Sequence, residues 1–200
     1  MPIAGGSILT IQIARVRLAA LLTASLLALS GCAESRVAEN AAFNEADLNF
    51  VEQMIPHHEQ AVQISQLAEN RAEDEEVRTI ASDIAFIQAI ELEELQGWLI
   101  EWGFDGAEHS HEDHADAAGM LSADEIQQLE ASSGSEFDAL FTQLMIQHHE
   151  GAIAAARELL ETGKSEDIRF FAQSLIESQG AELEQLRFIL ELLSPAEESE

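Results

Sequence analysis

The chain has 200 residues, which is enough for one domain with a substantial core, or for two small domains. It contains 38 acidic and 9 basic residues, which gives a formal net charge of -29. This balance argues against nucleic acid as a partner, because a phosphate backbone is bound by Lys and Arg. It fits a surface that attracts cations, and it equally fits a solvated, self-repelling exterior in a salty or extracellular setting.

The first 31 residues have the pattern of an export signal. They contain no acidic residue, and two arginines precede the apolar run LAALLTASLLAL, which is too short to span a membrane. LSGC then resembles a bacterial lipobox, whose cysteine is acylated and becomes the new N-terminus. We therefore expect residues 1–31 to be a signal peptide and Cys32 to carry a lipid that anchors an envelope protein to the membrane. Residues 32–42 are expected to form a flexible linker.

The rest of the chain contains an internal repeat. When the sequence is shifted by 91 residues, MIPHHEQAV (54–62) falls on MIQHHEGAI (145–153), and QxxEL at 88–92 falls on QxxEL at 179–183. The register holds without a gap over residues 45–103. A repeat of this length indicates that one structural unit is written twice.

Each copy predicts two helices, because its apolar residues recur at helical spacing and strand signals are scarce. Ser122 and Glu125 form a capping-box pattern before a further short helix. We therefore expect an all-α fold, a four-helix bundle of two antiparallel hairpins. The expected single domain, 43–194, consists of repeat one (43–103), a His- and acid-rich connector (104–122), a short helix (123–132) and repeat two (134–194), and an acidic tail (195–200) follows.

The Met-x-x-His-His frames are the strongest candidate site. On a helix, Met54 shares a face with His57 and His58, because residues three and four apart are neighbours. Met145, His148 and His149 repeat the arrangement. Thioether and imidazole donors together suit copper, and sulfur favours Cu(I). If the hairpins pack with pseudo-twofold symmetry, the two triplets can meet inside the bundle. Pro56 is expected to bend the first helix and to make the two sites differ.

Two residues on the second helix of each hairpin can support this site. Glu91 and Glu182, each preceded one turn earlier by Gln88 or Gln179, could orient an imidazole or bind the ion directly. The alternative is purely structural. In that interpretation the methionines fill the core, and the histidines form a hydrogen-bond network with the carboxylates.

The connector is a second candidate site for metal. His109, His111 and His114 lie among four carboxylates within residues 108–116, and Met120 follows. Short His-rich tracts bind Cu(II), zinc or nickel weakly. The alternative is a hydrated polar loop.

An enzyme is disfavoured by the same residues. Di-iron bundles use Glu-x-x-His on two helices, whereas only Glu108 and His111 have this spacing here, and they lie in the connector. The sequence also shows no Ser-His-Asp arrangement, glycine-rich phosphate loop or catalytic cysteine.

MIPHHEQA, the two QxxEL patterns, GML-S and FDALFTQLMIQHHEGAI together resemble the exported bacterial family described as domain of unknown function 305 (DUF305), over residues 43–193. The resemblance implies a ferritin-like four-helix bundle. It also implies copper binding, because the best-described members are periplasmic or secreted copper-binding proteins linked to copper resistance. The residues implicated are Met54, His57, His58, Met145, His148 and His149.

One departure from the family bears on the choice of metal. The family often has a methionine-rich stretch such as MPGMM where this chain has AAGML, which keeps only Gly119 and Met120. This difference weakens a preference for Cu(I) alone, and the His/Asp/Glu tract beside it favours Cu(II) or a mixed divalent preference that includes zinc.

The sequence thus predicts an envelope lipoprotein, outside the cytoplasm, that buffers, sequesters or hands on copper without catalysis. Two alternatives stay open. The first is a non-catalytic helical bundle with structural histidines that binds another envelope protein, and the second is a metal-dependent redox enzyme.

Overall fold

The structure, a computed structural model, describes residues 35–104 and 119–194. The expected signal peptide, Cys32, the three connector histidines and the acidic tail lie outside these residues. The helical domain belongs to a compact unit that begins at Val37.

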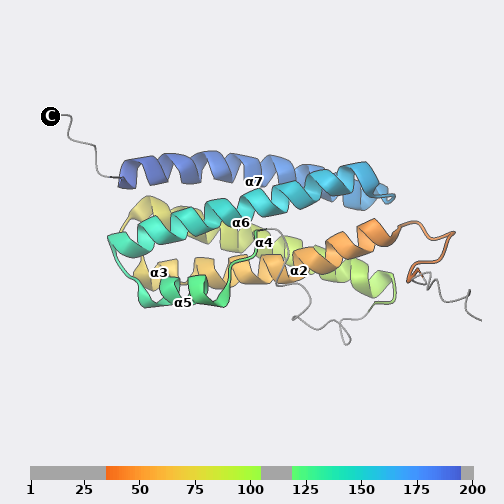
Figure 1. Cartoon of the computed structure of the whole chain (residues 1–200), viewed down its shortest axis with the longest axis horizontal. Coiled ribbons are helices and arrows are strands. Elements are labelled where there is room, and N and C mark those ends of the chain that lie inside the picture. The colour runs from red at the N-terminus through yellow and green to blue at the C-terminus, as the bar shows by residue number, and fades with distance from the viewer. Residues whose placement is uncertain (1–34, 105–118, 195–200) are drawn as a thin grey trace, which may run out of the picture. The chain divides into compact units, whose positions relative to one another are not determined.

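The domain is built from four long helices, which run side by side in Figure 1. The helix α2 packs mainly on α4, and α6 packs mainly on α7, while α2 and α6 join the two hairpins. This arrangement confirms the predicted all-α fold, and the described residues contain no strand. The helices are α2 (Glu45–Gln66), α3 (Ala68–Arg71), α4 (Glu75–Glu101), α5 (Ala123–Ala131), α6 (Ser135–Thr162) and α7 (Glu166–Leu193).

The helix ends are set by local capping. Ser122 and Glu125 form the predicted capping box of α5, in which each residue's side chain accepts from the other's backbone N–H. Asn44 and Asp47 form an equivalent box at the start of α2. The hydroxyl of Ser165 accepts from the N–H of Ile168 and caps α7.

Two equivalent buried aspartates tie the hairpins together. Asp47 of α2 accepts hydrogen bonds from the backbone N–H groups of residues 164 and 165, in the turn of the other hairpin. Asp138 of α6 does the same for residues 73 and 74. Burial raises the pKa of the Asp138 carboxyl, although these backbone N–H groups oppose the shift. Each carboxylate therefore fixes the turn that starts the second helix of the opposite hairpin.

The segment just before α2 differs from the flexible linker expected at residues 32–42. Val37 is buried in the core, and its backbone N–H donates to Glu45 Oε1 at 2.9 Å. Phe43 stacks on Trp102, with ring centroids 4.0 Å apart. The reason is that apolar side chains in this segment cover one end of the bundle, so residues from Val37 onward belong to the domain.

The apolar core consists of two clusters. Met54, Leu95 and Ala152 belong to one cluster, and Met145 and Ile84 to the other. Along each long helix, polar residues of the predicted site lie at or next to the change from one cluster to the other. Within the described residues, no helix combines the length and apolar character needed to cross a membrane.

Candidate metal centre

A layer of buried polar side chains lies at these positions. All four histidines of the repeated frames have no exposed surface, and both glutamines are 1% exposed. The layer therefore contains side chains from all four long helices. Its members are His57 and His58 of α2, Gln88 and Glu91 of α4, His148 and His149 of α6, and Gln179 and Glu182 of α7.

The two first histidines of the repeated pairs meet across the bundle. The rings of His57 and His148 have centroids 3.6 Å apart and planes inclined by 35°. Neither nitrogen of either ring has a hydrogen-bond partner. The structure thus brings together residues that are 91 positions apart in the sequence, and none of their four buried ring nitrogens is hydrogen-bonded to another protein group.

Burial lowers the pKa of both His57 and His148 well below the usual value for histidine, because the interior disfavours a charged ring. The neighbouring histidines lower it further, while a weaker backbone contact between the two residues acts in the opposite direction. Both rings are therefore neutral at pH 7. The neutral ring is the form that has a lone pair to offer a metal ion.

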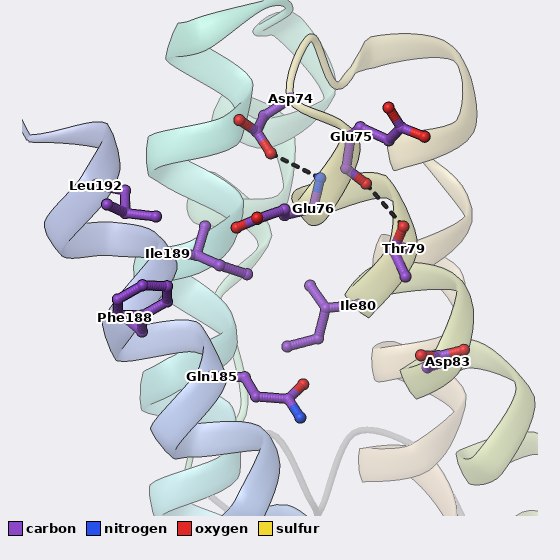
Figure 2. Close-up of a pocket in the computed structure, with 10 residues that line it drawn as sticks. All are labelled: Asp74, Glu75, Glu76, Thr79, Ile80, Asp83, Gln185, Phe188, Ile189 and Leu192. Carbon is purple, nitrogen blue, oxygen red and sulfur yellow. Dashed lines mark hydrogen bonds between the residues drawn. The ribbon is translucent and has the colours of Figure 1, made fainter.

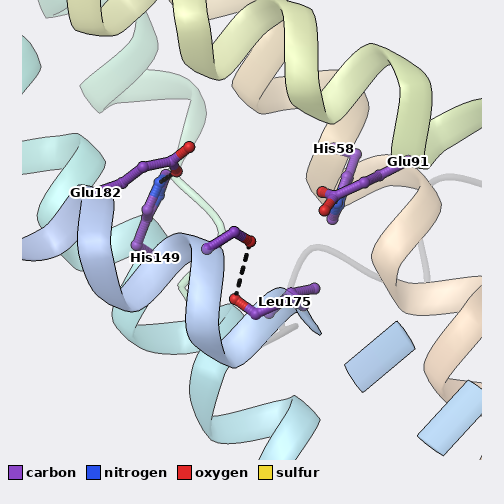
Figure 3. A network of polar contacts seen from close by, with 6 residues as sticks. His58, Glu91, His149, Leu175 and Glu182 are labelled. Atoms are coloured by element: carbon purple, nitrogen blue, oxygen red, sulfur yellow. Dashed lines mark hydrogen bonds and ion pairs between the residues drawn. The ribbon is translucent and has the colours of Figure 1, made fainter. Parts of the chain in front are cut away.

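The second histidines of the pairs are held by carboxylates (Figure 3). His58 Nε2 lies 2.9 Å from Glu91 Oε2, and His149 Nε2 lies 2.6 Å from Glu182 Oε2. A carboxylate accepts, so Nε2 of each ring is the donor, and in the neutral form of the ring this leaves the lone pair on Nδ1. Both Nδ1 atoms are buried and have no partner. Such carboxylate–histidine pairs commonly fix the tautomer of a metal-binding imidazole.

The glutamines add further unpaired groups to the layer. The side-chain nitrogen and oxygen of both Gln88 and Gln179 are buried without a partner. Leaving one buried polar group unsatisfied costs about 1–3 kcal/mol, and native proteins leave few of them. The layer therefore has the composition of a site that an ion or ordered water completes.

The methionines flank this layer on its two sides. Met54 is 1% exposed and Met145 is fully buried, and they belong to different apolar clusters. Within residues 35–104 and 119–194, no three His, Cys, Asp or Glu side chains are placed so that they could hold one ion together. An ion held by the stacked pair therefore needs a further donor of another type, and a thioether or a glutamine oxygen is available at the layer.

Residues 119–121, which we call the strap, contact both α2 and α6 beside the layer. The Gln60 side chain donates to the Leu121 carbonyl at 3.0 Å and accepts from the Leu121 N–H at 2.8 Å. A methyl group on Gly119 would lie 2.7 Å from the His148 carbonyl oxygen and 2.8 Å from the Gly151 Cα. The half-buried Met120 lies within this strap. The other connector residues predicted to bind metal, His109, His111 and His114, lie outside the described residues.

The strap accounts for a difference between the two motifs. MIPHHEQAV has Gln60 where MIQHHEGAI has Gly151, so one copy holds the strap by hydrogen bonds and the other allows close approach. Sequence reasoning missed this function, although the break in the repeat signalled it. Helix α2 is continuous through Pro56, and both copies form the same His–Glu pair. The predicted difference between the two sites in metal binding stays a prediction.

The sequence and fold of this chain match those of a known protein family. The family described as "Domain of unknown function (DUF305)" matches residues 47–190. The chain belongs to the DUF305 family. A candidate secreted DUF305 protein from Streptomyces coelicolor is 30% identical, with a TM-score of 0.68 over 74% of this chain and 93% of that one. A DUF305 fragment from Deinococcus radiodurans is 26% identical, with the same TM-score over 74% of this chain and 97% of that one.

A further solved relative of this DUF305 protein has metal bound. CopM in its Cu(I)-bound form is 26% identical, with a TM-score of 0.64 over 74% of this chain and 98% of that one. CopM has also been solved with Cu(II) and with silver. A search of curated proteins finds no match.

Proposed function

We propose that this DUF305 protein binds copper in its buried histidine layer and buffers the ion or hands it on, without catalysis. The observation that carries the proposal is the facing pair His57 and His148, whose rings are neutral at pH 7 and whose four buried ring nitrogens have no hydrogen-bond partner in the protein. CopM, which has the same fold, has been solved with Cu(I), Cu(II) and silver, and this supports the choice of metal.

The donors in the layer favour a soft ion. His57 and His148 would supply imidazole nitrogens, and Met54 or Met145 would supply sulfur, a combination that suits Cu(I). His58 and His149 would support the centre from the same two helices, oriented by Glu91 and Glu182, but in the described residues they are not placed to form a three-histidine set with the pair. We assign a Cu(II) or zinc preference only to the connector tract, where imidazoles and carboxylates are mixed in the sequence.

We also propose that the protein works outside the cytoplasm, anchored by a lipid at Cys32. The signal-like residues 1–31 and the lipobox-like LSGC support this location. The similarity to a candidate secreted protein of the family supports export.

A competitive titration tests the metal assignment. The protein without its signal peptide is titrated with Cu(I), in the absence of oxygen, against a chromogenic chelator, and the same titration is made with Cu(II). The double variant H57L/H148L should lose tight Cu(I) binding, whereas removing the connector histidines by H109A/H111A/H114A should leave it intact. Equal Cu(I) affinity in H57L/H148L and the unaltered protein would refute the proposed centre.

The competing proposal is a structural role for the histidines, and the two His–Glu pairs favour it because they form without metal. In that case neither Cu(I) nor Cu(II) would raise the melting temperature of the protein. A rise in melting temperature that saturates with Cu(I), and that is lost in H57L/H148L, distinguishes the two functions.

A further inference from the structure

One side of the bundle is open. Helices α4 and α7 make few contacts with one another, unlike the helices within each hairpin. A groove of about 720 Å³ lies between the start of α4 and the end of α7, as Figure 2 shows. A second hollow of about 430 Å³ continues along the same helices, shares Ile80 and Asp83 with the first, and reaches Glu182. Together they form the α4–α7 groove.

The groove exposes large apolar side chains from both helices. Phe86 of α4 is 69% exposed, and Phe188 and Leu192 of α7 are 58% and 61% exposed. Single exposed apolar residues are normal, but a cluster that lines a hollow is typical of a binding surface. Among the described residues, no further element lines this groove.

The rim of the groove has one sign of charge. Asp74, Glu75, Glu76 and Asp83 line it, and no Lys or Arg does so. The whole chain has the same sign, with a net charge of -29. A second copy would therefore place carboxylates against carboxylates, whereas a cationic partner would be attracted and correctly oriented.

We propose that the α4–α7 groove docks a protein partner through an amphipathic helix with basic flanks. The apolar face of that helix would cover Phe86, Phe188 and Leu192, and its Lys or Arg side chains would meet the acidic rim. Helices commonly bind in grooves between two other helices by laying their apolar face into them. The proposal does not rest on the proposed copper site, although Glu182, the carboxylate that holds His149, is among the residues that line the second hollow.

The test uses the protein without its signal peptide and without added metal. The probe is a fluorescent 18-residue peptide of Leu and Lys with its leucines on one helical face, and its binding is followed by fluorescence anisotropy. A peptide of the same composition with scrambled order is the control. We expect saturable binding of one peptide per chain, and at least tenfold weaker binding of the scrambled peptide.

Variants then locate the binding. F86E/F188E should weaken binding at least tenfold, because both side chains are exposed and line the groove. F170E is the matched control, since Phe170 lies on the same helix as Phe188, is 75% exposed and does not line the groove. Circular dichroism confirms that each variant is folded.

Charge variants test the rim. E76Q/D83N should weaken binding and reduce its dependence on salt, because both side chains are exposed at the groove. E158Q/E161Q, which removes two exposed carboxylates of α6, should have no effect.

Three results would overturn the proposal. The first is equal binding of the scrambled peptide, or an equal loss in F170E. The second is a concentration-dependent dimer that F86E/F188E abolishes, which would assign the groove to a second copy. The third is binding to phosphatidylcholine vesicles that the same variant abolishes, which would assign this face to a lipid surface.

Discussion

Replacing the stacked histidines by leucine should stabilise the metal-free protein. H57L/H148L removes four buried ring nitrogens that have no hydrogen-bond partner. At about 1 kcal/mol for each unsatisfied group, the gain is about 4 kcal/mol. The lost ring contact costs about 0.5–1.5 kcal/mol, and imperfect packing costs a similar amount. A net gain of about 1–3 kcal/mol remains, and it corresponds to a rise of roughly 2–12 °C in melting temperature for a domain of this size.

The contrasting variant is H58L/H149L. It breaks the pairs with Glu91 and Glu182 and leaves two largely buried carboxylates facing apolar groups. The expected loss is about 1–3 kcal/mol for each carboxylate that loses its donor, toward the lower end because water still reaches both carboxylates, and removing the two unpaired Nδ1 atoms offsets about 1 kcal/mol of each loss. Urea unfolding in the presence of a chelator, followed by circular dichroism, measures both variants. A large loss of stability in H57L/H148L would refute the reasoning, because it would mean that these rings are held by hydrogen bonds in the metal-free protein.

Three further predictions follow from the same structure. The metal-free protein should lose stability as the pH falls through about 6.5, the unfolded pKa of histidine, with a slope that approaches about 2.7 kcal/mol per pH unit for the two rings at lower pH. The reason is that His57 and His148 bind protons in the unfolded chain but not in the folded protein. Urea unfolding at pH 7.5, 6.5 and 5.5 measures this loss, and a free energy of unfolding that does not change with pH would contradict the lowered pKa values. G119A should destabilise the protein by about 1–3 kcal/mol, since Gly119 has φ 87° and its methyl would meet the α6 backbone. G180A, in open space within α7, should instead stabilise it by about 0.5–1 kcal/mol, and equal effects would rule out the strap contact. E91Q/E182Q should slow Cu(I) loading in a stopped-flow experiment, because these partly exposed carboxylates lie at the surface of the layer, while an unchanged rate would place ion entry elsewhere.

The repeat made much of the fold predictable from the sequence. A shift of 91 residues defined two hairpins, and the local capping pattern at Ser122 placed a helix start that the structure confirms. Such features depend on neighbours within a few residues, so they can be found without knowledge of the tertiary structure. The packing of Val37 on the bundle could not be found this way, because it depends on which end of the core remains uncovered.

The inward orientation of both histidines in each pair also could not be predicted. Adjacent residues on a helix point about 100° apart, so a pattern analysis normally assigns one to the core and one to the surface. Here both are buried, because α2 packs on α6 and also on α4. His57 thereby meets His148, and His58 meets Glu91. In α6, His148 likewise meets His57, and His149 meets Glu182. The two copies of the motif therefore form one connected layer.

The unpaired polar groups of the layer destabilise the bundle at its centre. This loss of stability favours a role for the layer in binding rather than in folding. An apolar side chain at His57 or His148 would join two core clusters that the layer now separates. Both hairpins nevertheless keep the same residues at the same distances, while they differ at Gln60 and Gly151, where the strap packs. The repeat has therefore diverged where covering the layer required it and has stayed constant where unpaired nitrogens face one another. A purely structural network would be expected to satisfy those nitrogens within the protein, whereas a site for an ion has to leave them free.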